Sequence, residues 1–250
     1  MKKIKLITVF VIFGTMVLIM SNPAIAGKVT LKVQASLSTA LPVLGSGLPW
    51  ASNKINEVSD GQLVLKVYEP GKLVKPFEIL DAVSRGFVDG GVAPSGFWAG
   101  KLPAAPIFSA IPFGPEADEF MAWLYHGNGL KLDQEMYDEA GYNVKVIPLL
   151  MMTPETSGWY SKPINSVDDL KGLKIRFYGY GGTVMQKLGA SVSMMPGSEL
   201  FPALEKHVLD ATEFSNPVID QRLGFYKMDG KMPSLCQYYQ SPWKFSCRTN

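Results

Sequence analysis

The sequence predicts an α/β protein made of two related domains, and three observations lead to that prediction. Strand-like segments alternate with amphipathic helical segments along most of the chain. A helix–turn–strand segment at residues 78–91 is repeated at residues 199–212. The 224 residues that follow an N-terminal export segment are enough for one large domain or two small ones with a sizeable core.

The first 26 residues have the pattern of a secretory signal peptide. Three lysines precede the apolar run 6–20, and Ala24-Ile25-Ala26 then supplies an A-x-A cleavage site. An uncleaved membrane anchor is the alternative, but the 15-residue run is shorter than the roughly 20 residues that span a bilayer. The pattern therefore predicts cleavage after Ala26 and a periplasmic location.

The charge of the exported chain excludes several classes of function. Removing the signal leaves 21 basic and 22 acidic residues, a net charge of −1, so nothing predicts a nucleic-acid partner. Two isolated histidines and two cysteines do not form a zinc site. The chain also lacks the G-x-S-x-G and H-E-x-x-H motifs, so no recognisable catalytic pair supports a hydrolase.

Hydrophobic periodicity and turn residues predict the elements of the first domain, residues 27–150. Its expected strands are 29–36, 63–68, 87–92 and 142–150. Its expected helices are 50–59, 76–85, 117–125 and 130–140.

The same signals predict the second domain, residues 151–235, and an atypical tail at 236–250. Its expected strands are 173–177, 192–195 and 208–214, with a short extended segment at 159–161. Its expected helices are 182–189 and 198–206, with one helical turn at 166–170 capped by Ser166.

The repeated segments share more than their helix-to-strand order. At an offset of 121 residues Asp89 coincides with Asp210, and Arg85 coincides with Lys206. Any helix-to-strand segment would show the general pattern, but the coincident aspartates favour two related domains. Two such domains leave a cleft, and clefts between domains are common sites for small ligands.

Arg176 is the first candidate binding residue, because it lies inside an apolar strand segment. A buried cation is costly unless it meets an anion, and the guanidinium fork fits a carboxylate. An internal Asp or Glu as its partner is an equally good interpretation. The glycines at 179–182 weakly resemble a dinucleotide fingerprint, but Val184 occupies the position that needs Gly or Ala.

Further candidates lie at the ends of predicted strands, where open α/β sheets bind ligands. Glu213 and Phe214 end the strand of the second repeat, and a solvated surface turn is the alternative for Glu213. Glu155 lies near the start of the second domain. Phe97 follows the first repeat and is expected either in the cleft or in the core.

Several segments together resemble one family, the DctP solute receptors of TRAP transporters, and most closely its 2-keto-acid (TakP-like) branch. The resemblance covers residues 28–227. Its matching segments are 77–83, 96–101, 157–159, 169–176, 185–189, 201–206 and 210–214.

This resemblance implies a venus-flytrap fold whose two α/β domains close over a small organic carboxylate, such as a 2-keto or 2-hydroxy monocarboxylate. Arg176 stands where the family binds the carboxylate. Glu213 and Phe214 stand at a Glu-Trp pair that contacts metal and substrate. Glu155 replaces a Gln that helps to hold sodium, and Phe97 replaces a cleft Tyr.

The resemblance also sets expectations for partners. It implies delivery to a sodium-coupled TRAP permease and a homodimer, which the keto-acid branch forms through a long helix that is expected to be absent from this chain. No cofactor is expected to be essential; a bound sodium or calcium ion is expected, and a second carboxylate at Glu155 favours calcium. Family members continue for about a hundred residues past this point, so the fold is expected to be incomplete at the C-terminus.

Three rival functions remain open from the sequence. They are an exported α/β hydrolase, a receptor for an ABC importer or a sensor kinase, and a non-functional fragment.

Overall fold

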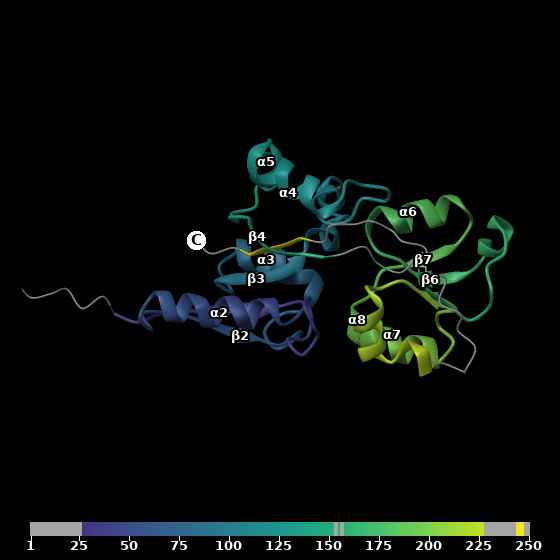
Figure 1. Cartoon of the computed structure of the whole chain (residues 1–250), viewed down its shortest axis with the longest axis horizontal. Coiled ribbons are helices and arrows are strands. Elements are labelled where there is room, and N and C mark those ends of the chain that lie inside the picture. Colours follow the sequence, from purple (N-terminus) through teal and green to yellow (C-terminus); the bar gives the residue numbers. More distant parts are fainter. Residues whose placement is uncertain (1–26, 153–154, 156–157, 228–243, 248–250) are drawn as a thin grey trace, which may run out of the picture.

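The computed structural model describes residues 27–152, 155, 158–227 and 244–247, which form two α/β units side by side (Figure 1). The signal peptide predicted for residues 1–26 lies outside the described residues, as does most of the predicted tail. Within the described ranges, no helix is long and apolar enough to cross a membrane.

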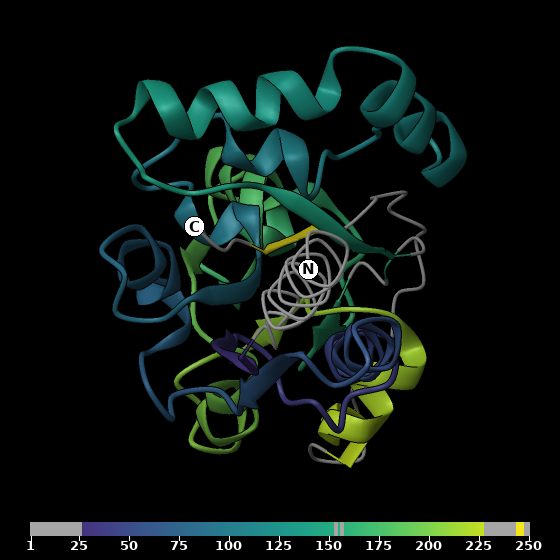
Figure 2. The same cartoon turned by 90° about the vertical axis from the view of Figure 1, so that its left-hand side faces the viewer.

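The first unit is built on a five-stranded sheet of order β2-β1-β3-β9-β4. Strand β1 is parallel to both β2 and β3, whereas β9, from the tail, is antiparallel to β3 and β4. The strands are β1 (Val29–Ala35), β2 (Leu63–Tyr68), β3 (Gly90–Pro94), β4 (Ile147–Met151) and β9 (Lys244–Cys247). The α-helices are α2 (Gly47–Val58), α3 (Ile79–Ser84), α4 (Ala117–His126) and α5 (Gly129–Glu139), and the 3-10 helices are η1 (Pro76–Glu78), η2 (Ser95–Trp98) and η3 (Ala105–Phe108). Helices α4 and α5 lie together on the side of β4 (Figure 2).

The second unit is built on a four-stranded sheet of order β5-β8-β6-β7. Strand β6 is parallel to β7 and β8, and β5 is antiparallel to β8. The strands are β5 (Trp159–Tyr160), β6 (Lys174–Arg176), β7 (Ser191–Ser193) and β8 (Ala211–Thr212). The helices are α6 (Gly179–Lys187), α7 (Gly197–Glu205), α8 (Pro217–Leu223) and the 3-10 helices η4 (Val167–Leu170) and η5 (Phe225–Lys227).

The repeat predicted from the sequence is confirmed by matching hydrogen bonds in the two units. Asp89 accepts the N–H of Lys32 at 2.7 Å and returns its own N–H to the Lys32 carbonyl at 3.0 Å. Asp210 makes the same pair of bonds with Lys174, at 3.0 and 2.8 Å. In each unit the aspartate therefore joins the start of the strand after the helix to the neighbouring parallel strand, β1 or β6.

The strands predicted at 87–92 and 208–214 are shorter in the structure, for one shared reason. The first two N–H groups of each segment donate to the preceding helix, at Ala82 in one unit and Ala203 in the other. These residues satisfy carbonyls at a helix end and cannot pair with a neighbouring strand. The strands therefore begin only after the helix ends are closed.

The strand predicted at 142–150 also begins late, at Ile147. The amide side chain of Gln134 donates to the Val144 carbonyl at 2.8 Å and accepts the Val146 N–H at 3.0 Å. This side chain on α5 thus occupies the backbone groups that a neighbouring strand would otherwise pair with.

Within the described residues, most of the buried apolar side chains belong to three clusters, one of which includes side chains from both units. Val33 and Leu48 of the first unit belong to the same cluster as Leu200 and Phe214 of the second. The two units therefore meet through a continuous apolar contact. The domain boundary predicted at residue 150 stays a prediction.

Candidate functional site

Arg176, at the end of β6, is buried in the second unit. Its side chain is 1% exposed, and a cation so removed from water needs hydrogen-bonding anions. Its Nη1 donates to the Glu213 carbonyl and, at 3.2 Å, to Glu213 Oε2. Its Nε is buried and has no hydrogen-bond partner within the described part of the chain. In this structure Arg176 therefore pairs with an internal acidic residue, as one of the two interpretations predicted. Its Nε remains a donor for a further hydrogen bond.

Glu213 is placed beside Arg176 by strand pairing. Arg176 is in register with Thr212 of the parallel strand β8, and the Glu213 N–H donates to the Arg176 carbonyl at 3.0 Å. The Glu213 side chain is buried, so the alternative of a solvated surface turn is wrong. Burial raises the pKa of Glu213, and the Arg176 charge opposes that rise.

Glu155 brings a second carboxyl group to the same place. It is buried, and its side chain hydrogen-bonds that of Glu213. Two adjacent carboxylates beside one guanidinium leave one negative charge, which a shared proton or a bound cation can balance. Carboxylate oxygens suit calcium or sodium, so the residues present fit the cation that the family resemblance implies. Within the described residues, no group of three or more His, Cys, Asp or Glu side chains could hold a metal ion, so further ligands would be carbonyls, water or the substrate.

Aromatic rings surround the guanidinium. The Phe214 ring centroid lies 5.2 Å from Arg176 Cζ, and the Tyr178 centroid lies 5.9 Å from it. Phe214 reaches this position because Gly197 leaves it room: a Cβ there would lie 2.6 Å from the ring. The side chain of Phe214 offers no metal ligand, so only its backbone carbonyl could serve that predicted role.

Tyr178 links this centre to the first unit. Its hydroxyl is 2.8 Å from Ser109 Oγ in a buried contact, and Ser109 Oγ accepts the Gly96 N–H at 3.0 Å. Its own N–H donates to Glu213 Oε2 at 3.0 Å. Burial raises the pKa of the Tyr178 phenol, so the hydroxyl stays neutral. The sequence analysis missed Tyr178 and Ser109; the position of Tyr178 two residues after Arg176 was the available signal.

The structure brings four of the five predicted residues together. Arg176, Glu155, Glu213 and Phe214 form one centre, and Phe97 joins it through a ring contact with Tyr178 at 5.9 Å. At the contact between the two α/β units, a buried cation meets two carboxyl groups and aromatic rings. This fold and this site are together typical of a two-domain ligand-binding protein.

Comparison with known proteins identifies the family. Residues 42–232 match the bacterial extracellular solute-binding protein family 7 (DctP), and the chain belongs to that family. The match confirms the prediction of a two-domain solute-binding fold and of an extracytoplasmic family. It also confirms that the family consists of binding proteins, which argues against the hydrolase alternative.

Three relatives illustrate the similarity. A monocarboxylate 2-oxoacid-binding periplasmic protein of Nostoc sp. (strain PCC 7120) is 36% identical over 88% of this chain. A TRAP periplasmic solute-binding protein of Pseudoalteromonas atlantica T6c, solved with sodium and pyruvate, is 32% identical with a TM-score of 0.83 over 89% of this chain and 67% of its own. A TRAP solute-binding protein of Bordetella bronchiseptica RB50, solved as a dimer with calcium and picolinate, is 29% identical with a TM-score of 0.84 over 90% of this chain and 66% of its own.

The chain spans about half the length of the curated relatives it matches, between 47 and 57%.

Proposed function

We propose that this chain is the solute receptor of a TRAP transporter and captures a small 2-oxo or 2-hydroxy monocarboxylate. The observation that carries the proposal is the buried guanidinium of Arg176, whose Nε lacks a protein partner within the described residues. A carboxylate is the anion that a planar guanidinium fork binds best. Relatives with bound pyruvate and picolinate support the same class of ligand.

A cation takes part in this capture. Glu155 and Glu213 would hold a sodium or calcium ion, with the backbone carbonyl of Phe214 as a further ligand. The excess negative charge of the two carboxyl groups favours calcium over sodium, because calcium takes several carboxylate oxygens. When bound, the ion would supply positive charge that offsets the two carboxylates and attracts the anionic ligand. Homologous structures that contain sodium or calcium support this role.

Capture couples to closure of the two units. Tyr178 contacts Ser109 across the units and Glu213 within its own unit, so the ligand site and the contact between units share one residue. A ligand that binds the closed form better shifts the protein toward it. The closed receptor then delivers the ligand to a sodium-coupled permease from the periplasm, after removal of the signal peptide. A homodimer also stays a prediction.

A ligand-dependent thermal-unfolding series tests the proposal. The purified protein is scanned with pyruvate, lactate, succinate and acetate, each with sodium or with calcium. At a hundredfold excess over Kd a ligand adds about 2.7 kcal/mol, which raises Tm by roughly 5–10 °C in a protein of this size. We expect this rise with pyruvate or lactate, larger with calcium, and lost with a chelator.

Two arginine variants complete the experiment. Arg176→Ala is expected to abolish the rise in Tm, whereas Arg85→Ala, on the exposed surface of the first unit, is expected to keep it. Equal responses of Arg176→Ala and the parent protein to pyruvate would contradict the proposal.

A further inference from the structure

The two carboxyl groups of the arginine centre come from segments that lie far apart in the sequence. Glu155 precedes strand β5, and Glu213 directly follows strand β8. The two strands pair over a short antiparallel ladder that begins with Trp159 opposite Thr212. Because so short a ladder is weak by itself, the separation of the two carboxyl groups depends on what else joins these segments.

A side-chain hydrogen bond adds a second connection between the same segments. The indole Nε1–H of Trp159 donates to Asp220 Oδ2 at 2.8 Å. Trp159 comes four residues after Glu155, and Asp220 comes seven residues after Glu213, on helix α8. The bond therefore fastens the chain that carries one carboxyl group to the chain that carries the other.

Asp220 is buried to an extent that is unusual for a carboxyl group. It is 0% exposed, and the adjacent Ile219 belongs to the apolar cluster against which Trp159 packs. A buried carboxyl group needs hydrogen-bond donors, and a buried indole N–H can only donate. Because apolar neighbours can replace neither partner, this polar pair fixes how β5 and α8 lie against each other.

Gly158 lets the two segments approach closely enough for this bond. Its φ is 134°, and a Cβ there would lie 2.8 Å from the Thr212 carbonyl oxygen. A larger residue would push the segment that carries Glu155 away from β8. Residues 158 and 159 thus supply both a close backbone contact and the indole donor.

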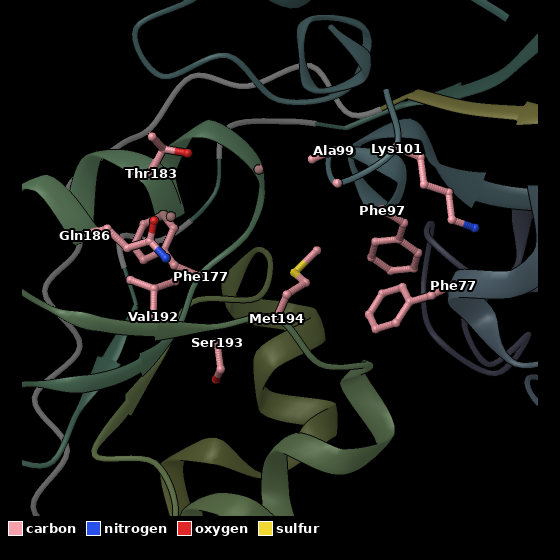
Figure 3. Close-up of a pocket in the computed structure, with 14 residues that line it drawn as sticks. Phe77, Phe97, Ala99, Lys101, Phe177, Thr183, Gln186, Val192, Ser193 and Met194 are labelled. Atoms are coloured by element: carbon pink, nitrogen blue, oxygen red, sulfur yellow. The ribbon is translucent and has the colours of Figure 1, made fainter. Parts of the chain in front are cut away.

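Trp159 and Asp220 lie outside the cavity between the two units. That cavity has a volume of about 450 Å³, with Phe97 on one side and Met194 on the other (Figure 3). Neither Trp159 nor Asp220 belongs to its lining. The pair therefore acts on the site through the position of two backbone segments, and not through contact with a molecule in the cavity.

We propose that Trp159 and Asp220 are positioning residues, whose hydrogen bond sets the separation of the Glu155 and Glu213 carboxyl groups and thereby favours calcium over sodium. This rests on the proposed function, because it takes the two glutamates as cation ligands. Calcium binds through several carboxylate oxygens, so its binding depends on both groups being in place, whereas a monovalent ion gains less from the second carboxylate. Residues that orient metal ligands from outside contribute about 10–100-fold to metal affinity.

Calcium titration of the purified, cation-free protein tests the proposal, first without sodium and then with sodium chloride as competitor. Trp159→Phe keeps an aromatic ring and removes the donor. It is expected to lower calcium affinity about tenfold and sodium affinity by about threefold or less. Asp220→Asn keeps an oxygen acceptor in a side chain of the same size and is expected to bind calcium as the parent protein does.

Gln134→Met is the matched control for the loss of a structural hydrogen bond. It removes side-chain bonds to the backbone before β4, in the first unit. This variant is expected to lower the urea midpoint of unfolding and to leave both cation affinities unchanged.

Urea unfolding of the cation-free protein separates positioning from stability. Trp159→Phe leaves Asp220 Oδ2 without its indole donor, so the unfolding midpoint should fall. Adding Asp220→Leu, whose side chain has the same branched shape, should raise the midpoint again without restoring calcium affinity. Recovery of both quantities would show that the pair only stabilises the fold, and it would overturn the proposal.

The remaining outcomes separate this proposal from the function on which it rests. Equal calcium affinities of Trp159→Phe and the parent protein would overturn the proposal alone, and so would equal losses for calcium and sodium. A parent protein that binds neither cation, and whose Tm does not rise with pyruvate, would overturn the proposed function as well.

Discussion

The two units share a framework and differ at one equivalent position, on strand β1 of the first unit and strand β6 of the second. Two residues after the lysine that pairs with the repeat aspartate, β1 carries Gln34 and β6 carries Arg176. Gln34 is fully buried, and backbone groups satisfy its amide: it donates to the carbonyls of Tyr68 and Glu69 and accepts the Leu73 N–H at 3.0 Å.

Arg176 is equally buried but carries a charge, and the neighbouring strand supplies Glu213 where the first unit has the apolar Val92. A neutral amide that the backbone satisfies completes a core, whereas a charged fork with an unused donor prepares a site for an anion. The comparison teaches that the repeated framework positions these residues, and that two residue differences distinguish the charged centre of the second unit from the neutral core of the first.

The largest expected effect comes from giving the second unit the residues of the first. Arg176→Gln alone leaves Glu213 buried without its cation, which should cost about 3–5 kcal/mol of unfolding free energy and abolish carboxylate binding. Adding Glu213→Val removes the stranded charge and should recover most of that stability without restoring binding. Urea unfolding and titration with pyruvate measure the two effects. A double variant that still binds pyruvate would show that the charged pair is not the site.

Tyr178, two residues after Arg176, tests how the two units are joined. Tyr178 corresponds to Ser36 in the first unit, and only the tyrosine reaches across to Ser109. Tyr178→Phe removes one buried hydrogen bond worth about 1 kcal/mol, so ligand affinity should fall roughly fivefold. Tyr180→Phe is the control, because its hydroxyl also crosses to the first unit, at the Pro103 carbonyl, but is more exposed. Equal losses for both variants would contradict a special role for Tyr178.

The two aspartates of the repeat, Asp89 and Asp210, should contribute equally to the free energy of unfolding. Asp89 and Asp210 are both partly buried, and each accepts one backbone N–H of the neighbouring parallel strand, from Lys32 and Lys174. Replacement by alanine should cost about 1–2 kcal/mol in either unit, and the double variant should show additive loss. Only Asp210→Ala should also weaken ligand binding, because it holds the strand that carries Arg176. Unequal losses in urea unfolding would mean that the repeat is not energetically equivalent.

The sequence predicted the framework well, because its signals are local. Helix caps and turn glycines act within a few residues of where they stand, and the repeated aspartate is visible as a coincidence in the sequence although it bonds to a distant strand. Helix α8 was missed although its signals were present: Asn216 caps it by accepting the Ile219 N–H at 3.1 Å, and Gly224 ends it with φ of 82°.

Other features had no local signal. Ser109 meets Tyr178 across 69 residues, and no spacing within either segment reports that contact. Whether Arg176 paired internally stayed open for the same reason, since the partner comes from a neighbouring strand 37 residues away. The late start of β4 depends on Gln134, a side chain on another element, so periodicity alone could not predict it.

The smallest expected effect concerns the turn that follows each repeated helix. Gly86 and its counterpart His207 both have positive φ, 73° and 54°, and a left-handed conformation is costly for a residue with a side chain. A Cβ at Gly86 would meet nothing within 4 Å, so backbone conformation alone sets the cost there. Gly86→His should destabilise the protein by about 1 kcal/mol, because histidine is strained in the left-handed conformation. His207→Gly should stabilise it by about 0.5 kcal/mol, because relief of that strain is partly offset by the larger entropy that glycine loses on folding. Urea unfolding of both variants is the measurement. Opposite signs would establish that the two turns are one structural position filled by different residues, whereas a loss of stability in His207→Gly would mean that the histidine side chain stabilises the second unit.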